Sequence, residues 1–166
     1  GNSADLASLT ASGTSATQAY TITVDDATTA DNGAVIAAAT TATTVDFSAA
    51  GVSDSFAELT NGTAVSAEMQ AIDAKDANVN VTVNDADLGL ATADNVTALN
   101  ALMGATTGTI TATVNGNSAI LGALQATGTG GNTQTLTIVV NDATTVDNGA
   151  AIAAATGAGT VNFSAG

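Results

Sequence analysis

The chain of 166 residues contains no histidine, cysteine, proline or tryptophan, and Lys75 is its single basic residue. Without histidine and cysteine, the usual general base and the thiol nucleophile of enzymes are missing. Serine and threonine are abundant, but no histidine is present to activate them. We therefore expect that the chain is not an enzyme. The absence of cysteine also excludes a disulfide framework.

The charge is almost entirely of one sign: fifteen Asp and Glu against one Lys give a formal net charge of −14. Phosphate backbones are bound by Lys and Arg, so nucleic acid is not an expected partner. No apolar run approaches the length of about 18 residues that a membrane helix needs, and we expect no membrane insertion. Acidity and the scarcity of trypsin sites fit an extracellular or cell-surface location.

What the chain does contain is Ala, Thr, Gly, Val, Asn and Asp. A hydrophobic content of 45% is too high for the usual signature of a disordered chain. Aromatic residues are few, and much of the apolar content is alanine. Such a composition suits closely stacked layers, in which each repeat touches only its neighbours.

One long sequence is repeated. Residues 20–51 read YTITVDDATTADNGAVIAAATTATTVDFSAAG, and residues 135–166 read TLTIVVNDATTVDNGAAIAAATGAGTVNFSAG. Matching residues within them, such as Asp31 and Asp147, are 116 positions apart. Upstream, GNSADLASL at 1–9 matches GNSAILGAL at 116–124. Residues 1–51 are therefore equivalent to 116–166, with an internal repeat of about 116 residues. A fixed-period repeat is typical of solenoids, and we expect one continuous unit over residues 1–166.

Six segments have the alternating, β-branched pattern of strands. Their spacing is uneven, about 23 to 35 residues, which is the size of one solenoid coil. The segments are 20–24, 43–47, 79–83, 109–114, 135–140 and 160–163.

Between the strands the apolar spacing becomes helical. Residues 90–104 place leucine, valine and methionine on one face. Residues 53–72 have the same spacing and begin with a capping box formed by Ser55 and Glu58. Two further segments with nearly identical sequences predict short helices: 31–40 and 147–156.

Strands alternating with short helices imply parallel pairing through crossovers. The sequence therefore predicts an α/β repeat fold, a right-handed parallel solenoid with a strand and a short helix in each coil. The alternative is a right-handed parallel β-helix with little helix. Alternation predicts that one set of apolar residues faces inward: Ile22, Val24, Val45, Phe47, Val81, Val83, Ile110, Ile138, Val140, Val161 and Phe163.

Acidic residues follow several of the predicted strands, and in a stack their turns would lie over one another. Ca²⁺ takes six to eight oxygen ligands and would relieve the repulsion between carboxylates. The alternative is that these residues only form turns and cap helices. No cofactor is required by the sequence, and Ca²⁺ is the candidate. Its candidate ligands are Asp25, Asp26, Asp31, Asp85, Asp87, Asp142 and Asp147.

The segment VTVNDADLGLATADNVTALNALMGATTGTITATVNGNSAILGAL at 81–124 resembles the long tandem repeats of giant secreted surface proteins and adhesins of cyanobacteria and other aquatic bacteria. The resemblance extends over essentially the whole chain in composition and rhythm. It implies secretion, Ca²⁺-rich surroundings and a role as stalk, fibre, coat or adhesin. The nonapeptide Ca²⁺ repeats of many such proteins are missing here.

Two functions follow as expectations. The first is a structural repeat segment of an extracellular bacterial surface fibre, filament, coat or adhesin, which acts by coil stacking and head-to-tail self-association. The second is a surface-binding module for polysaccharide, mineral or ice, which uses a Thr-rich or acidic sheet face. Because the sequence starts and stops inside the repeat, we expect the end coils to pair with further repeats or with other copies of the chain. The candidate residues for this pairing are Tyr20, Thr21, Ile22, Val161 and Phe163.

Overall fold

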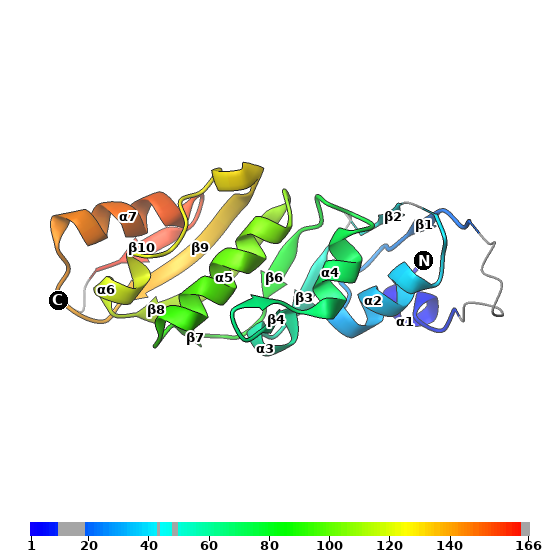
Figure 1. Ribbon diagram of the computed structural model, residues 1–166, viewed down its shortest axis with the longest axis horizontal. Helices are drawn as coiled ribbons and strands as arrows, with labels where there is room; N and C mark the ends of the chain where they lie inside the picture. The colour runs from blue at the N-terminus through cyan, green and yellow to red at the C-terminus, as the bar shows by residue number, and fades with distance from the viewer. Residues whose placement is uncertain (10–18, 43, 48–49, 164–166) are drawn as a thin grey trace.

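The computed structural model describes residues 1–9, 19–42, 44–47 and 50–163 (Figure 1). It has a mixed α/β fold with a mostly parallel six-stranded sheet and several helices. The sheet has the order β10-β9-β8-β6-β3, and β7 also pairs with β8. Its strands are β3 (Val52–Asp54), β6 (Val81–Val83), β7 (Leu88–Gly89), β8 (Thr109–Gly116), β9 (Thr133–Val140) and β10 (Thr160–Asn162).

A second, two-stranded parallel sheet lies at the N-terminal end, formed by β1 (Ile22–Thr23) and β2 (Val45–Asp46). A parallel bridge between Thr28 and Val52 joins this pair to β3. The order of the parallel strands in space therefore follows their order in the chain. The colours of Figure 1 accordingly run from one end of the elongated molecule to the other.

The registers place apolar residues of successive strands side by side. Ile22 lies opposite Val45, and Val81 lies opposite Ile110. Ile138 is flanked by Val114 on one side and Val161 on the other. Paired residues of successive strands are between 23 and 29 positions apart. One strand and the connection that follows it therefore together take up 23 to 29 residues.

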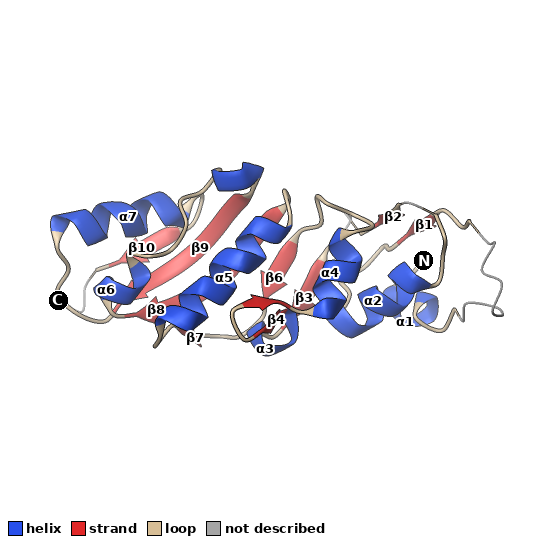
Figure 2. Cartoon of the chain, viewed as in Figure 1, coloured by secondary structure: helices blue, strands red, loops and turns tan. Residues whose placement is uncertain are grey.

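The longer helices form a layer over one face of the strands (Figure 2). Threonine begins three of them, because the hydroxyls of Thr29, Thr92 and Thr145 accept from the N–H group three residues on. The helices are α1 (Ser3–Leu6), α2 (Ala30–Ala38), α3 (Phe56–Leu59), α4 (Ala67–Asp73), α5 (Ala93–Ala105), α6 (Ser118–Leu121) and α7 (Val146–Thr156), with a 3₁₀ turn at Thr129–Gly131.

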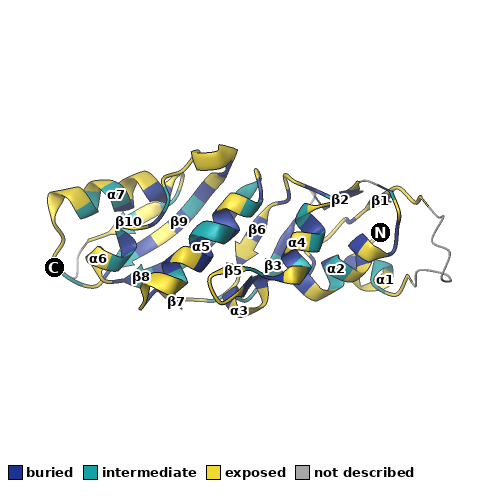
Figure 3. Ribbon diagram, in the orientation of Figure 1, coloured by how far each residue is buried: buried dark blue, intermediate teal, exposed yellow. Residues whose placement is uncertain are grey.

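The core lies between the strands and the helices, as the alternation predicted. The inward-facing apolar residues of β1, β2, β6, β8 and β9 are at most 4% exposed, whereas their threonine neighbours face out (Figure 3). Nine of the eleven residues predicted to face inward are buried. The exceptions are Val161, which is half-buried, and Phe163, which is 41% exposed. Both lie at the C-terminal end of the strand series.

The six predicted strands are all present within the described residues, although residue 43 lies outside them. The single helix predicted over 53–72 is wrong. A hairpin of β4 (Thr60–Asn61) and β5 (Ala64–Val65) separates α3 from α4. Gly62 makes this turn with φ of +63°, a conformation that favours glycine. One half of the predicted capping box is confirmed, since the Ser55 hydroxyl accepts from Glu58 N–H at 3.3 Å. The Ser55 N–H donates to Asp54 Oδ1 at 2.9 Å instead of to the Glu58 side chain.

Candidate functional site: two equivalent blocks and their end faces

Two blocks of the chain carry the same elements in the same order. The first block, residues 1–51, holds α1, β1, α2 and β2, and the second block, residues 116–166, holds α6, β9, α7 and β10. The first residues of the two blocks, Gly1 and Gly116, also make equivalent hydrogen bonds. The carbonyl of Gly1 accepts from Asp25 N–H at 3.0 Å, and the carbonyl of Gly116 accepts from Asn141 N–H at 3.0 Å.

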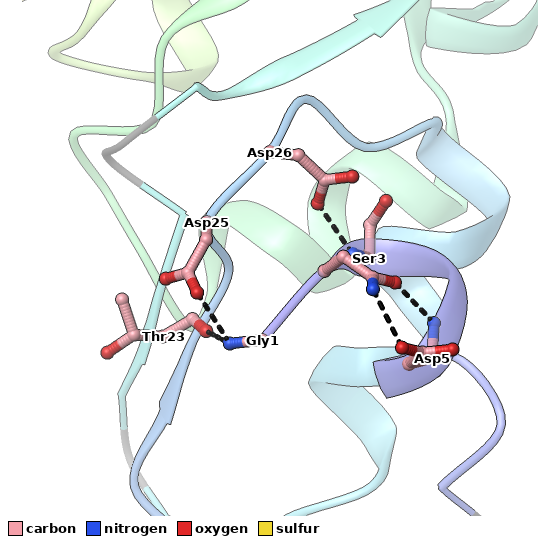
Figure 4. Close-up of polar contacts among 7 residues, drawn as sticks. Gly1, Ser3, Asp5, Thr23, Asp25 and Asp26 are labelled. Carbon is pink, nitrogen blue, oxygen red and sulfur yellow. Dashed lines mark hydrogen bonds and ion pairs between the residues drawn. The ribbon is translucent and has the colours of Figure 1, made fainter.

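Both blocks use an aspartate after the strand to hold the preceding helix. Asp26 accepts from the backbone N–H of Ser3 at 2.6 Å (Figure 4). Asp142 accepts from the backbone N–H of Ser118, also at 2.6 Å. These N–H groups begin α1 and α6 and have no partner inside their own helices. The repeated sequence therefore forms the same contact between successive strand–helix units in both copies.

Two further aspartates make the same type of contact in the middle of the chain. Asp54 accepts from Ala30 N–H at 3.0 Å, at the start of α2. Asp85 accepts from Phe56 N–H at 2.6 Å, at the start of α3. A negative charge at a helix N-terminus is also favoured by the helix dipole. In each case an aspartate at the end of a strand binds the first N–H group of a helix from the preceding strand–helix unit.

The seven candidate Ca²⁺ ligands are spread along the chain rather than gathered. Three of them cap helices as described. Asp25 is 66% exposed and pairs with the N-terminal ammonium group at 3.0 Å (Figure 4). Asp87 accepts a hydrogen bond from Asn115, and Asp31 and Asp147 are exposed in the first turns of α2 and α7. No three acidic side chains of the described residues lie together as a metal site would require. Calcium binding stays a prediction.

The sequence reasoning missed the segment that closes the first block. Asp76 is buried and accepts from Phe47 N–H at 2.8 Å. Lys75 Nζ donates to the carbonyls of Thr40 and Ala42, at 3.2 and 2.5 Å, just beyond the end of α2. A cation at this end of a helix also suits the dipole. The signal was available, because Lys75 is the only basic residue in the sequence.

Asp73, at the end of α4, has a carboxyl group with a raised pKa. Burial disfavours its ionised form, and the neighbouring charge of Asp76 raises the pKa further. Its Oδ1 atom has no hydrogen-bond partner among the described residues. Ionisation of Asp73 is therefore less favourable in the folded chain than in the unfolded chain.

The same set of residues is buried in the first block and at least partly exposed to solvent in the second block. Ala30 is 1% exposed, whereas its equivalent Val146 is 89% exposed. Phe47 is 1% exposed, and its equivalent Phe163 is 41% exposed. We call the open set the C-terminal face. It comprises Thr144, Val146, Gly149, Ala153, Val161 and Phe163, whose equivalents Thr28, Ala30, Gly33, Ala37, Val45 and Phe47 are all buried.

The cover over the first copy of this face comes from residues 52–83. A Cβ atom added at Gly33 would lie 2.6 Å from Ile72 Cδ1 of α4. The backbone N–H of Val45 donates to the carbonyl of Lys75 at 3.4 Å. At Gly149 the nearest atom to an added Cβ would be Thr144 Cγ2 of the same block, at 3.7 Å. The same sequence is thus shown packed against a neighbour and without one.

The opposite face shows the reverse arrangement. In the second block Leu124 and Leu136 are 5% and 0% exposed, beneath the segment that contains α5 and β8. Their equivalents in the first block, Leu9 and Tyr20, are 41% and 48% exposed. We call this open set the N-terminal face. It surrounds a hollow of about 250 Å³ lined by Gly1, Leu6, Leu9, Tyr20, Thr21, Ile22 and Thr23.

The five residues predicted for self-association belong to these two faces. Tyr20, Thr21 and Phe163 are exposed, Val161 is half-buried, and Ile22 is 4% exposed with its side chain in the core. Sequence reasoning did not find Leu9, Val146 and Gly149, which widen the faces beyond the strands. Association through them stays a prediction.

The outward face of the sheet carries registered threonines. Thr109, Thr111 and Thr113 of β8 lie opposite Thr133, Thr135 and Thr137 of β9. All six are exposed or half-buried. The threonines of the expected Thr-rich sheet face are therefore in register across these two strands.

Within the described part of the chain, the helices are all too short or too polar to cross a membrane. Comparison of the chain with protein-family models, with curated proteins and with solved structures finds no match.

Proposed function

We propose that the chain is a structural repeat segment of an extracellular bacterial surface fibre, filament, coat or adhesin. In this proposal residues 1–166 form one continuous right-handed parallel α/β solenoid. Its activity is mechanical: strand–helix units stack on one another, and the stack extends head to tail through further repeats or further copies. Catalysis and nucleic-acid binding have no part in it.

One observation carries this proposal: equivalent parts of the chain make equivalent stacking contacts. The aspartate contacts to Ser3 and Ser118 are the same in both blocks, and parallel strands pair in the order of the sequence. A structure built in this way gains a neighbour for each added unit. The buried set in the first block and the open set in the second block support further stacking at the ends.

Sedimentation velocity across a range of concentrations tests the proposal, with negative-stain imaging of the same samples. We expect species larger than the monomer that grow with concentration and appear as thin filaments. Salt should favour them, because each copy carries a net charge of −14 and screening weakens the repulsion between copies. A chain that remains monomeric at high concentration and high salt would contradict self-association.

A second candidate is a surface-binding module for polysaccharide, mineral or ice. The registered threonines of β8 and β9 favour it, because they place hydroxyls in rows on one exposed face. A saturable ligand and a loss of binding in Thr111→Val with Thr135→Val would support this function. The matched control is Thr23→Val, at an exposed position of β1 outside those rows.

A further inference from the structure

Resting on the proposed function, we infer that the C-terminal face of one copy docks on the N-terminal face of a second copy of this chain. In this joint β10 runs parallel to β1 of the next copy. Phe163 enters the hollow lined by Leu6, Leu9 and Tyr20. The partner is thus a second copy, and the joint is head to tail.

The direction of the strands permits this joint. β1 is parallel to β2, the Thr28–Val52 bridge is parallel, and β3, β6, β8, β9 and β10 follow in parallel pairs. β10 and β1 therefore run in the same direction at opposite ends of the molecule (Figure 1). Moving a second copy along the strand series brings its β1 beside β10 without reversing either strand.

In the second block, the position beside the strand that corresponds to β1 is occupied by β8. There β8 lies against β9, with Val114 opposite Ile138, and the inward residues Ile110 and Ala112 alternate with threonines. β10 has the same alternation, because Val161 lies on the inward face beside Ile138 and is flanked by the exposed Thr160. β1 is the strand of the first block that corresponds to β9. β10 can therefore pair with β1 while keeping its apolar residues toward the core.

Backbone groups are oriented for pairing on both sides of the joint. In the first block the N–H groups of Val45 and Phe47 donate away from β1, to Lys75 and Asp76. The equivalent groups of Val161 and Phe163 lie on the outer side of β10, where no further strand of the described chain pairs.

On the outer side of β1, Thr23 O accepts from the Gly1 ammonium group at 2.9 Å. Because alternate residues of a parallel strand point to the same neighbour, Thr21 also points outward. The Gly1 ammonium group already binds the carbonyl of Thr23, so the pairing with a second copy falls at Thr21. An edge with unpaired N–H and C=O groups recruits another strand. No proline occurs in the sequence to block either edge.

The apolar residues left open at the two ends complement each other. One end presents the exposed side chains of Phe163 and Val146, and the other presents a hollow lined by Leu6, Leu9 and Tyr20. Burial of aromatic side chains dominates the energy of protein interfaces. Because the two faces differ, the contact is heterologous. Copies stacked along the strand series in this way extend into an open filament rather than a two-fold dimer.

Single-cysteine variants test this joint, since the natural chain has no cysteine. The substituted residues are Thr160 of β10 and Thr21, directly before β1, which are both exposed. β10 and β1 lie toward opposite ends of the molecule (Figure 1). With a short bismaleimide, we expect the mixture of the two full-length variants to give covalent dimers, and neither variant alone to do so. Thr160→Cys mixed with Thr82→Cys, an exposed position on β6, is the matched control and should not cross-link above background.

A third substitution separates assembly from folding. Phe163→Ala in the Thr160→Cys copy should lower the cross-linking yield roughly tenfold or more. The same substitution in the Thr21→Cys copy is the control and should leave the yield unchanged, because the Phe163 of that copy lies outside the cross-linked joint. The far-ultraviolet circular dichroism and the unfolding midpoint of this variant should stay close to those of the parent, because Phe163 is already partly exposed.

The outcomes distinguish this joint from the proposed function. Concentration-dependent assembly without cross-links between positions 21 and 160 would overturn the joint and leave the structural role standing. Dimers formed by Thr160→Cys alone would indicate a two-fold contact and would also overturn it. An absence of any assembly would contradict both.

Discussion

Two glycines with the same local sequence should respond oppositely to alanine. Gly33 and Gly149 both follow Asp-Asn near the start of a helix, in α2 and α7. Alanine in a helix interior is favoured over glycine by about 1 kcal/mol. At Gly149 the added Cβ makes only an ordinary contact, 3.7 Å from Thr144. We therefore expect Gly149→Ala to stabilise the chain by about 0.5–1 kcal/mol.

At Gly33 the same methyl group meets a covered face. The added Cβ would lie 2.6 Å from Ile72 Cδ1 and 3.1 Å from Ile72 Cγ1, and Ile72 is 0% exposed. Forcing a methyl group into a packed core costs about 1–3 kcal/mol, which cancels or exceeds the gain in helix propensity. We expect Gly33→Ala to be neutral or destabilising by up to about 2 kcal/mol.

Urea unfolding of both variants at low protein concentration, followed by circular dichroism, measures the difference. One kcal/mol corresponds to about 2–4 °C in melting temperature for a chain of this size, so a thermal scan gives an independent value. Equal stabilisation by both substitutions would refute the reasoning, because it would mean that α4 does not cover Gly33. Equal destabilisation would mean that Gly149 is covered even in the monomer.

The remaining predictions concern the core, the caps, one carboxyl and calcium. Phe47→Ala should destabilise the chain by about 3–5 kcal/mol, since Phe47 is 1% exposed; a loss below about 1 kcal/mol in urea unfolding would contradict its place in the core. Asp85→Ala should cost about 1 kcal/mol by leaving Phe56 N–H without its acceptor, whereas the exposed Asp31→Ala should change stability less, and equal losses would argue against the cap. The raised pKa of Asp73 means that the folded state binds its proton more tightly than the unfolded state, so this group lowers stability as pH rises above about 4. The unfolding free energy of Asp73→Asn relative to the parent should therefore increase from acid to neutral pH, and a constant difference would contradict the shift. Calorimetry in EDTA and in millimolar Ca²⁺ at matched ionic strength tests calcium binding: bound Ca²⁺ raises the melting temperature, and equal melting temperatures leave the aspartates as caps.

Much of the fold was predictable because the strands carry a strong period-two signal. Val, Ile and Thr alternate through 109–114 and 135–140, and the structure has strands over both. The same alternation gave the buried side of each strand. It failed at Phe163, where burial depends on a neighbouring strand that the sequence of β10 does not specify.

Other features were hidden because they depend on contacts distant in the chain. β3 and β7 have only three and two residues, too few for a period, and their pairing with β6 and β8 defines them. The hairpin within 53–72 was missed because Val65, Met69 and Ile72 keep helical spacing across the break. The local signal for it was the two-residue loop Gly62-Thr63 between the paired Asn61 and Ala64, because glycine is favoured at the first position of such a hairpin turn.

For the acidic turns, the sequence pattern did not distinguish metal ligands from helix caps. Asp26, Asp85 and Asp142 were expected either to bind Ca²⁺ or to serve as turn and cap residues. The structure places each within hydrogen-bond distance of the first N–H group of a helix that lies 23 to 29 residues earlier in the chain. Sequence reasoning foresaw caps within the same turn, but not caps supplied by the next strand, since that requires knowledge of the register.

Hydrogen–deuterium exchange at increasing protein concentration tests the central claim most directly. Peptides covering Tyr20–Thr23 and Thr160–Phe163 should gain protection as the concentration rises, because each strand edge becomes paired with the other in a second copy. Peptides from β8 and β9, which are already paired on both sides, should keep the same protection throughout. End-strand peptides that exchange equally fast at every concentration, in a chain that sediments as a monomer, would contradict the account.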